Sequence, residues 1–60
     1  MQLITYSVRL IDNNGQVHRS GQVQFLDSIP KKQAIKAVAQ QHQRAEANVL
    51  LIQEGREDIA

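Results

Sequence analysis

Cysteine and tryptophan are absent from the 60 residues, and proline, tyrosine and phenylalanine occur once each. Without cysteine there is no disulfide, and zinc or iron–sulfur sites built on thiolate ligands are excluded. Both aromatic residues fall at positions that we expect to face a core, so none is left to stack on nucleobases. The lack of cysteine agrees with a reducing compartment, and we expect a cytoplasmic protein.

Long apolar runs are also missing. No stretch approaches the roughly 18 apolar residues that span a bilayer, and residues 1–6 lack the basic start and apolar stretch of a signal peptide. Hydrophobic residues make up 42% of the chain and charged residues 22%, which is usual for folded domains. We expect one α+β domain over residues 1–60. A chain of this size buries only about 60% of its unfolded surface, so its thin core favours self-association.

Residues 2–26 have the pattern of a β-hairpin. Apolar and polar residues alternate in two runs, as in half-buried strands. Asn14-Gly15 between them predicts a two-residue type I′ turn. Pairing across that turn puts Ile4 opposite Phe25, and the apolar residues of both strands then share an inner face.

The same register assigns faces to the residues after the turn. It puts Val17 on the inner face and His18 on the outer face. Arg19 falls opposite Leu10, on the inner face near the turn.

A helix is expected next, over about 30–45. Asp27 and Ser28 are residues that cap exposed N–H groups, and Pro30 is tolerated in a first turn. An alanine-rich apolar stripe at helical spacing follows, which lets the helix lie close to the sheet.

The last part of the chain predicts a third strand over about 48–54 and a frayed tail over 55–60. The apolar run at 49–52 is typical of a buried strand. The order is therefore β-β-α-β. We expect an α+β fold with a three-stranded antiparallel sheet, the third strand beside the first, and one helix packed on one face.

The other face of this sheet has nothing in the chain to cover it. Uncovered apolar patches usually mark interaction sites. We therefore expect a protein interface there, formed with a second copy of the chain and with a protein partner, and the alternative is a solvated face with scattered apolar residues. The expected interface residues are Leu3, Thr5, Arg9, Ile11, Gln22, Gln24 and Leu26.

A basic surface is the second candidate site. Lysine in the first turn of a helix opposes the helix dipole, which favours anions there, and this points to phosphate contact. A solvated helix face is the alternative. The candidate nucleic-acid-binding residues are Lys31, Lys32, Lys36, Arg44 and Arg19.

Catalytic and metal sites have little support. His42 and Glu46 are one helical turn apart, but two ligands make a weak metal site. The three glycines are isolated, so there is no phosphate-binding loop. We expect no enzyme, no cofactor, no small-molecule substrate and no membrane partner. The sequence predicts a regulatory module that binds protein, with nucleic-acid binding as the alternative.

Two resemblances accompany this interpretation. The hairpin and helix resemble the N-terminal DNA-binding module of phage-type tyrosine integrases, through residues 12–15, Phe25 and residues 31–39. The interval between the phenylalanine and the helix is longer here, and a third strand follows. Residues 34–37 and 49–52 resemble small bacterial α/β domains of unknown function. The resemblances imply a bacterial or phage origin, and the first implies DNA contact.

Overall fold

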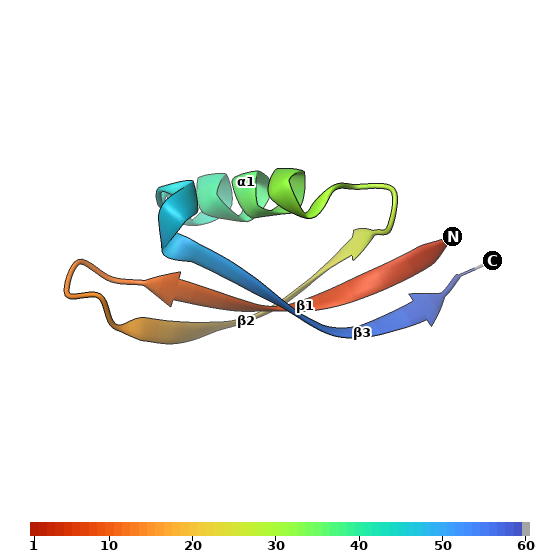
Figure 1. Cartoon of the computed structure of the whole chain (residues 1–60), viewed down its shortest axis with the longest axis horizontal. Helices are drawn as coiled ribbons and strands as arrows, with labels where there is room; N and C mark the ends of the chain where they lie inside the picture. The colour runs from red at the N-terminus through yellow and green to blue at the C-terminus, as the bar shows by residue number, and fades with distance from the viewer. Residues whose placement is uncertain (60) are drawn as a thin grey trace.

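The computed structural model describes residues 1–59 as a three-stranded antiparallel sheet with one helix on one face (Figure 1). Strand β1 is central, and the sheet order is β2-β1-β3. The expected β-β-α-β order, with the third strand antiparallel to the first, is confirmed. The elements are β1 (Gln2–Ile11), β2 (Val17–Leu26), α1 (Lys31–His42), the 3-10 helix η1 (Glu46–Asn48) and β3 (Val49–Asp58).

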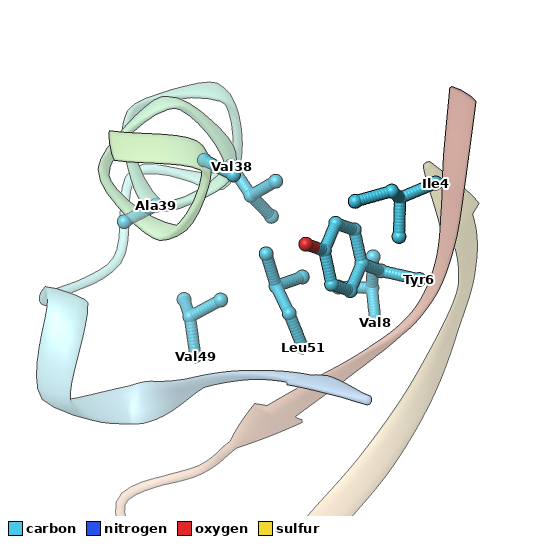
Figure 2. Packing of buried hydrophobic residues seen from close by; sticks show 8 residues of the cluster. Ile4, Tyr6, Val8, Val38, Ala39, Val49 and Leu51 are labelled. Atoms are coloured by element: carbon cyan, nitrogen blue, oxygen red, sulfur yellow. The ribbon is translucent and has the colours of Figure 1, made fainter. Parts of the chain in front are cut away.

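The core lies between α1 and the inner face of the sheet (Figure 2). Every second residue of β1 from Ile4 to Val8 points into it, as a strand requires. The Tyr6 ring packs against Phe25 at a tilt of 57°, with 6.4 Å between the ring centroids. The buried hydrophobic residues are Ile4, Tyr6, Val8, Ala34, Val38, Ala39, Val49 and Leu51.

The hairpin turn is not the type I′ turn that Asn-Gly predicts. Gly15 has a φ of 81°, whereas neither Asn13 nor Asn14 has a positive φ. The Asp12 N–H donates to the Gln16 carbonyl at 2.9 Å, and the Gly15 N–H donates to the Asp12 carbonyl at 3.0 Å. These bonds enclose a three-residue loop, in which a type I turn precedes a left-handed residue. The loop is therefore one residue longer than expected.

A bulge in β2 offsets that extra residue. Near the turn Arg9 lies opposite Arg19, but farther along Ser7 lies opposite Gln22. Over this interval β2 contains one residue more than β1. Gly21 lies in the bulge with a φ of 92°, a conformation that glycine adopts without steric cost. Beyond the bulge, the strands have the register that the apolar pattern predicts.

Between turn and bulge, three face assignments from the sequence are wrong. His18 is paired with Leu10 and therefore lies on the helix side of the sheet. Val17 and Arg19 lie on the outer side, opposite Ile11 and Arg9. The reason is the added loop residue, since a shift of one residue reverses the face of every side chain.

Helix α1 begins later than predicted. Pro30 is the N-cap residue, and no side-chain hydrogen bond caps the helix, so the expected capping by Asp27 and Ser28 is wrong. The Gln33 N–H donates to the Pro30 carbonyl at 3.0 Å. The first turn contains no acidic residue.

The helix also ends earlier than predicted, at His42 instead of near Ala45. Gln43 adopts the left-handed conformation with a φ of 56°, and the Arg44 N–H donates to the Ala39 carbonyl at 2.9 Å. This is a Schellman-type ending with glutamine where glycine is usual. No helix within residues 1–59 is long and apolar enough to cross a membrane.

Strand β3 continues well beyond its predicted end. Residues 55–58 pair with the start of β1, as far as Gln2 opposite Asp58, so the frayed tail predicted over 55–60 is wrong for these residues. Ala60 lies outside the described residues. Glu54 is an extra residue in β3, because Thr5 lies opposite Gly55 and the next residue of β1 lies opposite Gln53. Both edge strands therefore carry a bulge.

Candidate protein-binding face

One face of the sheet points away from α1 and is covered by no other element of residues 1–59 (Figure 1). We call it the open face. Strand register assigns its side chains, because residues directly opposite each other point to the same side. The open face consists of Leu3, Thr5, Ser7, Arg9 and Ile11 from β1, Val17, Arg19, Gln22, Gln24 and Leu26 from β2, and Leu50, Ile52, Gly55 and Glu57 from β3.

Large apolar side chains are exposed on the open face. The exposed fractions are 53% for Val17, 43% for Leu50 and 48% for Ile52. A face that carried only solvated residues would not need aliphatic side chains on all three strands. The other apolar members are half-buried Leu3, Ile11 and Leu26.

The positive charge of the open face is concentrated near the hairpin turn. Arg9 and Arg19 lie directly opposite each other on neighbouring strands, an arrangement in which like charges repel. Neither forms an ion pair within residues 1–59, and the Nε atom of Arg9 is buried without a hydrogen-bond partner. Glu57 lies opposite Leu3, at the other end of the face.

The middle of the open face is polar on β1 and β2. Ser7 is only 1% exposed, because Gln22 and Ile52 flank it on the two neighbouring strands. Its hydroxyl has no hydrogen-bond partner within the described chain. Next to it, the side-chain amide of Gln24 donates to the Thr5 hydroxyl at 3.2 Å.

The structure brings all seven expected interface residues together on the open face. The alternation pattern left open which residues of β3 belong there, and it did not predict Val17, Arg19 or Glu57 on this face. The isolated glycine at position 21 is a signal for a bulge, and it could have corrected the face assigned to Val17. Glu57 could not be assigned to a face from the sequence, because the pattern predicts that the strand ends at Gly55, whereas β3 continues through it to Asp58.

The expected basic site is divided between two sides of the sheet. Lys31, Lys32 and Lys36 are exposed on α1, and Arg44 follows it. Arg19 lies on the open face, away from the helix. The structure therefore separates Arg19 from the other four residues.

The helix side also carries a shallow hollow of about 340 Å³. Its lining combines two of the helix lysines with a carboxylate from η1. No ion pair joins these groups within the described residues. The lining residues are Pro30, Lys32, Gln33, Lys36 and Glu46.

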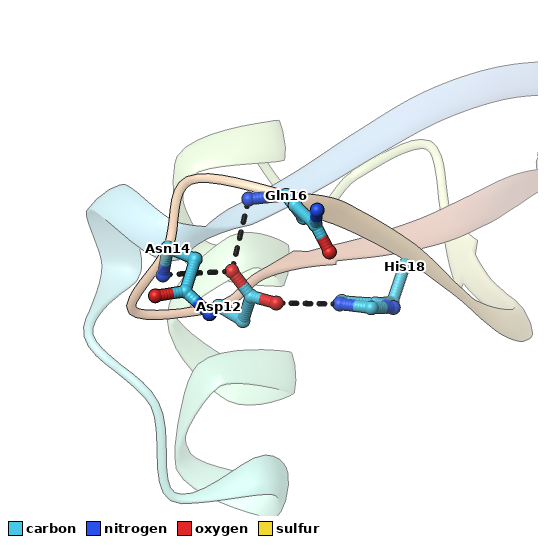
Figure 3. A network of polar contacts seen from close by, with 4 residues as sticks. All are labelled: Asp12, Asn14, Gln16 and His18. Carbon is cyan, nitrogen blue, oxygen red and sulfur yellow. Dashed lines mark hydrogen bonds and ion pairs between the residues drawn. The ribbon is translucent and has the colours of Figure 1, made fainter.

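Asp12 organises the hairpin turn (Figure 3). Its Oδ1 accepts hydrogen bonds from the N–H groups of Asn14 and Gln16, both at 2.9 Å, and its Oδ2 lies 2.7 Å from His18 Nε2. The His18 hydrogen bond and then the Gln16 N–H lower the pKa of the Asp12 carboxyl from its ordinary 3.8. No group of three or more metal-ligating side chains occurs within residues 1–59.

Comparison with protein-family models, with curated proteins and with solved structures gave no match.

Proposed function

We propose that this protein is a small regulatory interaction module that binds a protein chain through the open face and catalyses no reaction. The observation that supports it most is the set of aliphatic side chains on all three strands of a face that no element covers. Such a patch favours burial against another protein. We expect this binding to take place in the cytoplasm.

The edges of the sheet are less suited to binding than its face. A free strand edge can add another strand, but a bulge interrupts the row of backbone groups that would pair. Here β2 has a bulge at Gly21 and β3 has one at Glu54. The bulges therefore favour contact through the face.

Site-specific photo-crosslinking in cells tests which surface binds. A photoreactive amino acid at position 22 would probe the open face, and the same residue at position 40 would probe the exposed side of α1. Both positions hold exposed glutamines, so the two substitutions are matched. We expect a discrete crosslinked protein band from position 22 and none from position 40. Bands from position 40 alone would contradict the proposal.

Nucleic-acid binding through α1 is a second candidate. It is favoured by Lys31, Lys32 and Lys36, which are exposed and have no ion-pair partner within the described chain. The first helical turn also lacks an acidic residue, so the helix dipole and the lysines attract anions together.

A titration of labelled duplex DNA at low and near-physiological salt tests this second candidate. Phosphate contact predicts affinity that falls steeply with salt, and it predicts loss of binding in Lys32→Glu/Lys36→Glu. Arg19→Glu is the control for position, since Arg19 lies on the other side of the sheet. Equal binding by the double variant and the wild type would exclude the helix as a DNA-binding surface.

A further inference from the structure

We infer that the open face binds a second copy of this chain, with the two sheets packed face to face and their β1 strands antiparallel. This inference rests on the proposed function and adds the identity and orientation of the partner.

Opposite charges lie at opposite ends of the open face. Arg9 and Arg19 lie near the hairpin turn, and Glu57 lies opposite Leu3 at the far end. Leu3 and Arg9 are six positions apart along β1, which is roughly 20 Å at about 3.3 Å per residue. Within one chain this distance keeps Glu57 away from the arginines.

A two-fold axis brings these ends together. In an isologous dimer each contact occurs twice. With antiparallel β1 strands, the end with Glu57 lies over the end with Arg9 and Arg19 of the partner copy, at both ends of the interface. With parallel strands, the arginine ends would lie over each other. The charges therefore select the antiparallel arrangement.

The apolar residues match in the same orientation. Ile11 and Val17 form the apolar end near the turn, and Leu3 and Leu26 form the far end. Antiparallel packing places one aliphatic pair over the other, while Ile52 next to the central Ser7 lies near the axis. Each copy thus supplies the apolar cover that the other lacks.

The size of the face predicts a reversible dimer. Strands of ten residues in a three-stranded sheet span a rectangle of roughly 33 by 14 Å. Packing two such faces together buries on the order of 1,000 Å² in total, which is the lower limit for a specific interface. We therefore expect monomer and dimer in exchange.

Two charge-reversal variants test this arrangement in a mixing experiment. In Glu57→Arg, both ends of the face are positive. In Arg9→Glu/Arg19→Glu, both ends are negative. Each variant alone should dimerise about tenfold or more weakly than wild type in sedimentation velocity, and an equimolar mixture should dimerise again. Because Arg9 is half-buried, circular dichroism must first show that the double variant folds. Arg19→Glu alone gives a second variant with a smaller effect in the same direction.

The matched control separates specific pairing from net charge. Lys32→Glu/Lys36→Glu changes the net charge by the same amount as the arginine double variant, but on α1. Mixed with Glu57→Arg, it keeps one complementary and one repulsive end, so this heterodimer should be weaker than the one in the test mixture. Heterodimer in this control equal to that in the test mixture would overturn the inference.

A strictly monomeric wild type would also overturn it. If position 22 still crosslinks to a different protein in cells, the open face binds another partner, and the proposed function stands without the second copy. Absence of both dimer and crosslinks would contradict the two proposals together.

Discussion

Gly21 restores the strand register that Gly15 shifts by one residue. Gly15 ends the hairpin loop in the left-handed region with a φ of 81°, and Gly21 forms the bulge with a φ of 92°. Without the bulge, the turn would send Val23 and Phe25 to the open face, because one residue reverses every face. The inner core and the open face therefore both depend on this pair of glycines.

Gly21→Ala should destabilise the domain more than Gly55→Ala. A left-handed conformation costs a residue with a Cβ roughly 1–2 kcal/mol, whereas Gly55 has no positive φ and an added Cβ there meets nothing within 4 Å. Urea unfolding of the two variants measures the difference. Equal stabilities would contradict the role of the bulge.

Acid should destabilise the hairpin through Asp12. Its pKa is lowered in the folded chain, so its contribution to stability is present above the ordinary pKa and is lost as the pH falls through the lowered pKa. The melting temperature of the wild type should therefore fall more steeply between about pH 5 and pH 2 than that of Asp12→Asn. Asp27→Asn, away from the turn, should follow the wild type. Parallel curves for wild type and Asp12→Asn would exclude the effect.

Val38→Ala should be one of the most damaging small substitutions. Val38 is 1% exposed and packs from α1 onto the sheet. Loss of two buried methyl groups and the resulting cavity should cost about 2 kcal/mol. The same change at Val17, which is 53% exposed, should change the free energy of unfolding of dilute protein by less than about 0.5 kcal/mol. Similar losses at both positions would contradict the core described here.

Gln43→Gly should stabilise the domain. Gln43 holds a φ of 56° at the end of α1, where glycine has no Cβ penalty. The gain should be about 0.5–1 kcal/mol in the free energy of unfolding, after the greater entropy of glycine in the unfolded chain. Gln41→Gly, inside the helix, should lose about 1 kcal/mol instead. A loss at position 43 would show that the left-handed ending is wrong.

Much of the fold was predictable because its apolar periods are regular. Alternation over the first two strands and the alanine-rich stripe of α1 gave the element order and the inner face. The turn and the bulge were harder to predict, because Asn-Gly is compatible with loops of two or three residues. Gly21 is the one sequence signal for the bulge that restores the register. The end of β3 was missed because Gly55 and the charged residues after it resemble a tail, although they pair with the start of β1.

The candidate site was predictable where it depends on alternation alone. Leu3 and Ile11 follow from the period of β1. The position of Arg19 on the open face could not be predicted in this way, because it depends on the register between the turn and the bulge. The placement of Glu57 at the opposite end of the open face from Arg9 and Arg19 becomes visible only when β3 is known to extend to Asp58. No local sequence pattern predicts it.

Sedimentation velocity of the wild type and Ile52→Lys over a range of concentrations tests the central claim most directly. Ile52 is 48% exposed near the centre of the open face, so lysine there should leave the monomer folded and place a charge in the interface. We expect the wild-type sedimentation coefficient to rise with concentration toward that of a dimer, and Ile52→Lys to remain monomeric. A wild type that stays monomeric, or an Ile52→Lys variant that associates equally well, would contradict self-association through the open face.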